Sequence, residues 1–289
     1  MALQFEHTHR ILQESRLFKP DPSVVEQANI TRYLRRKGFR SWEEAYAWSI
    51  REPEAFWAEM AGELEWFRPW RKVLEWNPPY AKWFVGAQTN IVHNALDRWM
   101  KTPVRNKVAF YWEGEDGSTR TLSYADLFRE VNRAASALRK LGIGKGDRVV
   151  IYLPRIPEQI VAMLAVARIG AVHSVVYSAF AAPALRDRIE DAEARAVITC
   201  DGYYYGGKLV ERKSNVDEAL RDNRTVRHVI VVRRAGIDVP MVAGRDYEWN
   251  ELLAGAGDEE PVVPVDAEDM LYTLYTSGTT GKPKGVVHV

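Results

Sequence analysis

The sequence predicts an α/β fold with mostly parallel sheets flanked by helices. From Lys107 onward, short apolar runs alternate with longer segments that have helical apolar spacing. Several of the apolar runs are nearly continuous, which is typical of strands buried on both faces. A strand–helix–strand rhythm of this kind favours a parallel sheet. The chain has 289 residues, 46% of them hydrophobic, so it can bury a sizeable core.

The elements follow one another from Lys107 to the end of this region. Val108–Trp112 is the first strand candidate, and Ser123 can cap the helix that follows it. The apolar stripe of that helix consists of Leu127, Val131, Ala134, Ala135, Leu138 and Leu141. The later strand candidates are Arg148–Leu153, Ala171–Tyr177, Arg195–Cys200 and Val226–Val232. The later helix candidates are Pro157–Ile169, Ala182–Ala194 and Asn215–Arg221, and Ala254–Pro264 is a linker.

The first part of the chain has a different texture. Residues 1–40 are polar and rich in Arg and Lys, which suggests a helical or partly ordered extension. Ser41 and Glu44 have the spacing of a capping box ahead of a helix. Asn90–Met100 is predicted as another helix, with Ile91, Ala95, Leu96 and Trp99 on one side. We therefore divide the chain into an extension, residues 1–101, and a domain, residues 102–289.

The bulk composition excludes several classes of protein. A net charge of +1 gives no reason to expect nucleic acid or an anionic membrane as a partner. The single cysteine, Cys200, rules out a disulfide within the chain, and a reducing cytoplasm is the simplest setting. Charged residues between Glu6 and Arg16 leave no room for a signal peptide, and no apolar run is long enough to span a bilayer.

The most specific segment runs from Leu271 to Val289. Two apolar strand candidates, Leu271–Tyr275 and Val286–Val289, flank the run T-S-G-T-T-G-K-P-K-G at 276–285. Its glycines allow close approach of the backbone to a ligand, its hydroxyls can donate to phosphate oxygens, and its lysines add positive charge. The residues in question are Thr276, Ser277, Gly278, Thr279, Thr280, Gly281, Lys282, Lys284 and Gly285. Such a loop suits a polyphosphate.

A Walker P-loop does not fit this run. That motif needs four residues between its glycines and a hydroxyl residue directly after its lysine. Here two residues separate Gly278 from Gly281, and Pro283 follows Lys282. The segment after Pro283 also has the pattern of a strand, whereas a P-loop leads into a helix.

Thr276–Gly285 instead resembles the signature T-S-G-[ST]-T-G-x-P-K-G of the acyl-adenylate-forming superfamily, and matches it at each position. Within it, the chain is most similar to AMP-forming acetyl-CoA synthetases, from about Tyr33 onward. The similar stretches are Lys82–Gly86, Asn94–Arg98, Ile156–Glu158, Ala162–Ala165, Ala167–Val176 and Leu185–Asp191. The resemblance implies an incomplete large amino-terminal domain of the acyl-adenylate-forming fold, without the small carboxy-terminal domain.

The resemblance also implies a reaction. Members couple acetate or another short carboxylate to ATP, giving an acyl-adenylate and pyrophosphate, and coenzyme A then displaces AMP. Mg²⁺ accompanies the ATP. The 276–285 loop would hold the β and γ phosphates, with Lys284 offsetting charge on the leaving pyrophosphate. The segment matching the CoA-contacting region is Tyr205, Gly206, Gly207 and Lys208, although Tyr205 stands where many members have arginine.

The remaining candidate residues have simpler interpretations. His173 lies in an apolar strand and is expected to be a packed core histidine, and Cys200 a buried small side chain. His288 alone does not make a metal site, so no protein metal site is expected. Two alternatives stay open: a non-catalytic remnant or interaction module that keeps the fold, and a ligase for propionate or a longer acyl chain.

In the family, the acyl pocket, the ribose-binding aspartate and the lysine needed for adenylation all follow the position of Val289. We therefore expect the 289-residue chain alone, lacking that carboxy-terminal half, to be inactive. The measurement is acetate-dependent exchange of pyrophosphate into ATP by the purified chain. Exchange above the rate of a no-acetate control would contradict the expectation.

Overall fold

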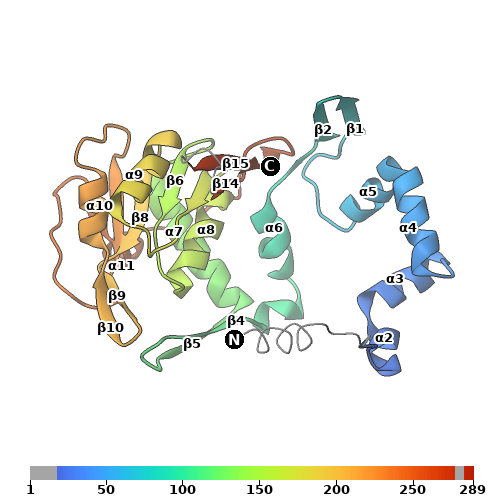
Figure 1. The fold of residues 1–289 in the computed structure, drawn as a ribbon, viewed down its shortest axis with the longest axis horizontal. Helices are drawn as coiled ribbons and strands as arrows, with labels where there is room; N and C mark the ends of the chain where they lie inside the picture. The colour runs from blue at the N-terminus through green and yellow to red at the C-terminus, as the bar shows by residue number, and fades with distance from the viewer. Residues whose placement is uncertain (1–17, 277–282) are drawn as a thin grey trace, which may run out of the picture. The chain divides into compact units, whose positions relative to one another are not determined.

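The computed structural model describes residues 18–276 and 283–289, which divide into two units at Ala61 and Gly62 (Figure 1). The first unit contains helices α2 (Pro22–Gln27), α3 (Asn29–Lys37), α4 (Trp42–Arg51) and α5 (Pro53–Ala61). The N-cap expected at Ser41 is confirmed, because its side chain accepts a hydrogen bond from the Glu44 N–H at 3.3 Å. The Glu44 carboxylate, however, accepts from the N–H of Arg40 rather than of Ser41.

The second unit is built on a seven-stranded sheet, which confirms the predicted α/β class. Its strand order is β12-β11-β8-β6-β7-β14-β15. Neighbouring strands are parallel, except that β15 runs antiparallel to β14. The strands are β6 (Arg148–Ile151), β7 (Val172–Val175), β8 (Ala196–Cys200), β11 (His228–Val232), β12 (Asp246–Glu248), β14 (Tyr272–Thr276) and β15 (Lys284–His288).

Helices cover both faces of this sheet and form its two cores with it. On one face pack α7 (Tyr124–Lys140), α8 (Pro157–Arg168) and α11 (Trp249–Ala254). On the other pack α9 (Ala182–Asp191) and α10 (Lys213–Ala219). Alternate residues of each central strand point to opposite cores: Val149 and Ile151 to the first, Val150 to the second. This two-sided burial explains why these strands are apolar almost throughout.

Within residues 18–276 and 283–289, four pairs of short antiparallel strands lie outside the main sheet. They are β1 (Lys72–Asn77) with β2 (Tyr80–Val85), β3 (Gln88–Thr89) with β13 (Val265–Asp266), β4 (Val108–Glu113) with β5 (Thr119–Ser123), and β9 (Gly202–Tyr205) with β10 (Lys208–Glu211). Of these strands, the sequence pattern predicted only β4. Among the described residues, none of the helices has the length and apolar character needed to cross a bilayer.

The helix predicted at Asn90–Met100 is wrong in length and in its buried side. The chain forms α6 (Ile91–Ala95), breaks at Leu96, and continues as the 3-10 helix η1 (Asp97–Trp99); a second, η2, is Pro103–Asn106. Leu96 of the predicted side is buried, but Ile91 of that side is 51% exposed and Val92 is buried in its place. The Asn90 side chain caps α6 through the Val92 N–H, so the helix starts one residue into the predicted segment.

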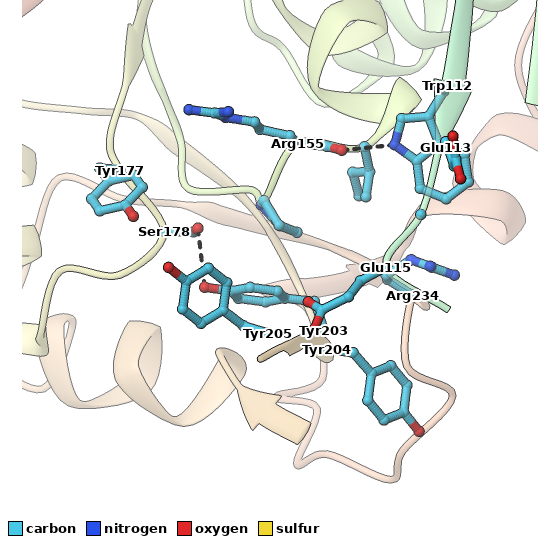
Figure 2. Close-up of a pocket in the computed structure, with 13 residues that line it drawn as sticks. Trp112, Glu113, Glu115, Arg155, Tyr177, Ser178, Tyr203, Tyr204, Tyr205 and Arg234 are labelled. Atoms are coloured by element: carbon cyan, nitrogen blue, oxygen red, sulfur yellow. Dashed lines mark hydrogen bonds between the residues drawn. The ribbon is translucent and has the colours of Figure 1, made fainter. Parts of the chain in front are cut away.

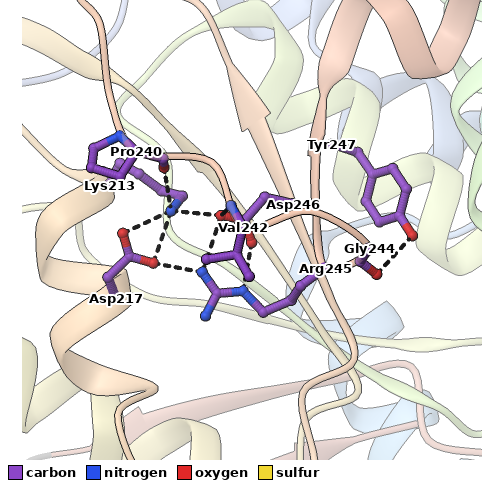
Figure 3. A network of polar contacts seen from close by, with 8 residues as sticks. All are labelled: Lys213, Asp217, Pro240, Val242, Gly244, Arg245, Asp246 and Tyr247. Atoms are coloured by element: carbon purple, nitrogen blue, oxygen red, sulfur yellow. Dashed lines mark hydrogen bonds and ion pairs between the residues drawn. The ribbon is translucent and has the colours of Figure 1, made fainter.

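A buried network of charges joins α10 to the segment between β11 and β12 (Figure 3). The Lys213 ammonium, fully buried, lies 2.7 Å from Asp217 and 2.8 Å from Asp246, and donates to the Pro240 carbonyl at 3.0 Å. Arg245 bonds to both aspartates, at 2.7 and 2.5 Å. Two cations therefore face two carboxylates, and each buried charge has partners.

Replacing Lys213 by methionine should destabilise the chain by about 3–5 kcal/mol, because a buried carboxylate then loses a partner. The matched control is Lys145→Met, which removes a lysine from a half-exposed ion pair with Asp269 and should cost less than about 1 kcal/mol. Urea unfolding measures both free energies. Equal losses in the two variants would contradict this account of the network.

Candidate active site

The sheet has a switch point between β6 and β8, where the connections diverge. β6 leads through α8 to β7 on one side, whereas its other neighbour β8 leads through α10 to β11 in the opposite direction. In open α/β sheets, the loops that follow two such strands leave a crevice at their carboxyl ends, and ligands bind there. The topology therefore points to the loops after Ile151 and Cys200.

A cavity of about 330 Å³ lies at this position (Figure 2). The loop after β6 contributes Pro154 and Arg155, and the loop after β7 contributes Tyr177 and Ser178. The full lining is Trp112, Glu113, Gly114, Glu115, Pro154, Arg155, Ile156, Tyr177, Ser178, Tyr203, Tyr204, Tyr205 and Arg234. The volume falls in the range of small-molecule sites.

One wall of the cavity is the run of three tyrosines on β9. Tyr203 is buried, and its hydroxyl accepts a hydrogen bond from Ser178 at 3.2 Å (Figure 2). The Arg212 guanidinium lies over the Tyr203 ring, 5.3 Å from its centroid. Tyr205, by contrast, is 65% exposed, so its ring is free to stack on a planar ligand.

The opposite wall carries a cation and its partners. The Arg234 guanidinium lies 5.1 Å from the centre of the Trp112 ring and 3.0 Å from the Asp116 carboxylate. Hydrogen bonds from Ser118, with the smaller effect of Arg234, lower the pKa of Asp116 to about 2. The Trp112 indole N–H donates to the Arg155 carbonyl at 2.8 Å (Figure 2). The cavity thus combines aromatic faces with two cations, Arg155 and Arg234, and two carboxylates, Glu113 and Glu115.

The structure brings one of the four predicted CoA-contacting residues to this cavity. Tyr205 lines it, whereas Gly206, Gly207 and Lys208 lie at the β9–β10 turn outside its lining. The two glycines have φ of 59° and 70°, values that favour glycine, and the Gly207 N–H donates to Glu115 at 2.7 Å. The sequence analysis missed Trp112, Arg155, Tyr177 and Arg234, which reach the cavity from distant segments without a local motif.

The predicted phosphate loop connects β14 to β15. Thr276 pairs with Lys284, and Tyr275 with Gly285, in the antiparallel register that closes this hairpin. A side chain at Gly285 would come within 3.2 Å of the Thr273 methyl, so glycine fits the close approach. The candidates Ser277, Gly278, Thr279, Thr280, Gly281 and Lys282 lie outside the described residues. Because β14 is parallel to β7, Thr276 lies at the same edge of the sheet as the cavity.

Side-chain contacts attach this hairpin to the rest of the domain. The Tyr272 ring stacks between His173 of β7 and His288 of β15, with centroids 5.5 and 4.3 Å apart. The Tyr275 hydroxyl donates to Asp191 at 2.7 Å, and Arg188 lies over its ring. Burial, reinforced by the Asp191 carboxylate, raises the pKa of Tyr275, so its hydroxyl stays a donor.

The simpler interpretations of His173 and Cys200 agree with the structure. His173 is buried, and that burial lowers its pKa to about 4. Cys200 is fully buried, which raises the pKa of its thiol to about 12 and leaves it unreactive. No group of three metal-ligating side chains exists in the part of the chain that the structure describes.

The sheet topology and the cavity at its switch point define an open α/β protein with a ligand-binding crevice at the carboxyl ends of its strands. The chain belongs to the AMP-binding enzyme family, whose model matches residues 96–289. A second model, described as the acetyl-coenzyme A synthetase N-terminus, matches residues 42–95.

Individual relatives extend this likeness over nearly the whole chain. Acetyl-coenzyme A synthetase from Methanothrix thermoacetophila is 48% identical over 278 residues, 96% of this chain and 42% of the relative. The Rubrobacter xylanophilus synthetase is 52% identical over 244 residues, 84% of this chain and 38% of the relative. The acetoacetyl-CoA synthetase from Streptomyces lividans has a TM-score of 0.86 and 33% identity, over 95% of this chain and 43% of its own. The chain therefore spans about two fifths of the length of these relatives.

Stability should fall as the pH drops below the ordinary histidine pKa. Burial lowers the pKa of His173 from 6.5 to about 4 in the folded chain. As the pH falls, this histidine therefore binds a proton in the unfolded chain before it does so in the folded chain. The contribution of the neutral ring to the free energy of unfolding is fully present above pH 6.5 and is lost as the pH falls towards 4. The expected loss between pH 7 and pH 5 is about 2 kcal/mol. His173→Phe keeps a stacking ring without a titrating group. Chemical unfolding at both pH values should show a smaller loss for this variant, and equal losses would contradict the assignment.

Proposed function

We propose that this chain carries the ATP-phosphate loop and the coenzyme A cavity of an AMP-forming ligase that joins acetate, or a similar short carboxylate, to coenzyme A. The reaction is ATP + acetate + CoA to acetyl-CoA + AMP + pyrophosphate, through an acyl-adenylate. The observation that supports this proposal most is that Thr276 ends β14 and Lys284 begins β15, so the two described ends of the 276–285 motif lie at the sheet edge that also holds the switch-point cavity. The synthetase names of the relatives support the same reaction.

In the first half-reaction, the loop binds the β and γ phosphates of ATP. Thr276, Ser277, Thr279 and Thr280 donate hydrogen bonds, and Gly278, Gly281 and Gly285 allow backbone N–H groups to approach. The exposed Lys284 ammonium, with Lys282, offsets the charge that develops on the leaving pyrophosphate. Mg²⁺ accompanies the ATP as the counter-ion of its phosphates. Attack by the carboxylate on the α phosphorus then yields the acyl-adenylate.

In the second half-reaction, the switch-point cavity holds the nucleotide end of coenzyme A. Tyr205 offers an exposed face for the adenine ring, and Arg155 and Arg234 supply positive charge for phosphate groups. Lys208 and the Gly206–Gly207 turn lie next to this wall and can contact the same ligand from outside the cavity. Thr276 and the cavity share one edge of the sheet, which supports a thiol that enters from the cavity side and attacks the acyl carbon of the acyl-adenylate, with AMP as the leaving group.

We also propose the domain division at 101 and 102, with residues 1–101 as an extension of the acetyl-CoA synthetase type. The family boundary between residues 95 and 96 lies close to it. Small-molecule substrates, a carboxy-terminal half as partner and a cytoplasmic setting belong to the same proposal.

A hybrid enzyme tests the proposed function. This chain replaces the matching segment of the Methanothrix synthetase, and acetate-dependent release of pyrophosphate and formation of acetyl-CoA are measured. We expect activity in the hybrid, and a loss on the order of 10²-fold or more in Lys284→Ala, because the charge on pyrophosphate is then unbalanced.

The matched control is Lys101→Ala, another exposed lysine, which should leave the rate unchanged. A folded hybrid that binds ATP without acetate-dependent pyrophosphate release would favour a non-catalytic role. Activity that is present but insensitive to Lys284 would contradict the role given to the loop.

A further inference from the structure

The two walls of the switch-point cavity meet at one buried carboxylate, that of Asp201. Asp201 follows β8 directly, and its side chain has no exposed surface. Its Oδ1 accepts hydrogen bonds from the Gly202 N–H at 2.7 Å and from the Arg234 N–H at 2.8 Å. The same oxygen accepts from Ala235 at 3.0 Å, and Oδ2 accepts from Ile237 at 3.0 Å. One side chain thus satisfies four backbone donors.

These four donors belong to both walls. Gly202 begins β9, the strand that carries Tyr203–Tyr205. Arg234, Ala235 and Ile237 belong to the segment after β11, which has no strand partner of its own at these residues. The carboxylate therefore replaces the missing ladder bonds of that segment and fixes it against β9. Without this carboxylate the N–H groups of Ala235 and Ile237 would lose their acceptor, which costs free energy, whereas the Arg234 N–H also donates to the Val232 carbonyl at 3.1 Å.

The segment that Asp201 holds carries Arg234, one of the two cations of the cavity. The Arg234 side chain leaves this backbone to lie over Trp112 and to pair with Asp116. Its space is limited, because a side chain at Gly114 would come within 2.8 Å of both the Arg234 guanidinium and the Trp112 ring. A shift of the backbone at 234 would therefore move the guanidinium out of a close-fitting place. The cavity depends on Asp201 although Asp201 is not among its lining residues.

We propose that Asp201 is a positioning residue for coenzyme A binding, which acts by holding Arg234 at a fixed distance from the tyrosine wall. This inference rests on the proposed function of the cavity. Charge is part of the role, since a carboxylate can accept all four hydrogen bonds. An asparagine amide instead turns an NH₂ group towards at least one of these donors.

The test is a calorimetric titration of the 289-residue chain with coenzyme A, which measures the dissociation constant. Asp201→Asn should raise the dissociation constant by about tenfold or more, through the lost acceptor. Asp238→Asn is the matched control, because Asp238 is exposed and lies on the same segment, and it should bind like the wild type. Arg234→Gln should weaken binding by a similar factor.

The double variant distinguishes positioning from a general loss of structure. If Asp201 acts through Arg234, Asp201→Asn should add less than twofold to the effect of Arg234→Gln, since the group it positions is already gone. Fully multiplicative effects, or wild-type affinity in Asp201→Asn, would overturn the inference. A wild-type chain that does not bind coenzyme A would instead count against the proposed function of the cavity, and with it this role of Asp201.

A second measurement applies if Asp201→Asn does not fold. Amide hydrogen exchange of the wild type then reports on the same bonds. The N–H groups of Arg234, Ala235 and Ile237 should be protected to the level of the β11 core, because a buried carboxylate holds them. Exchange at the rate of an exposed loop would overturn the proposal.

Discussion

The pairing of β6 with β8 is the constraint on which the rest of the structure depends. Because the chain leaves these two neighbours in opposite directions, their carboxyl ends are not bridged, and a crevice forms between the loops after Ile151 and Cys200. Helices on both faces of the sheet bury β6 and β8, which is why both strands consist mostly of apolar residues. The aromatic cavity lies at this edge, and so does Thr276 at the carboxyl end of β14.

Polar groups are buried around this edge in a consistent way. Apolar side chains alone cannot pair the backbone N–H and C=O groups of the loops, so buried charged side chains form hydrogen bonds with these groups. Asp201 gathers the N–H groups after β11, and Lys213 reaches the Pro240 carbonyl farther along the same segment. Each of these charges is matched, by N–H groups or by the carboxylates of Asp217 and Asp246. Tyr205 and Arg155, which line the cavity, remain exposed, so both side chains are accessible to a ligand.

The sequence predicted the parts of the fold that periodicity encodes. The central strands, the helices between them and the β14–β15 hairpin were correct in type, because burial on two faces or on one stripe leaves a clear apolar pattern. Strands β1, β2, β9 and β10 were not predicted, since they are short and their residues do not alternate regularly between buried and exposed. The cavity could not be predicted from the sequence for a different reason. Trp112, Tyr177 and Arg234 are far apart in the chain and come together only through the crossover topology. The motif at 276–285 could be found because its residues are contiguous.

We propose that the switch-point cavity binds the nucleotide end of coenzyme A and that the 276–285 motif binds the β and γ phosphates of ATP. A crystal structure of the chain grown with coenzyme A tests it most directly. The account predicts the adenine ring against Tyr205, between the β9 wall and Arg234. Adenine bound anywhere else on the second unit, with the cavity occupied only by solvent, would contradict the account.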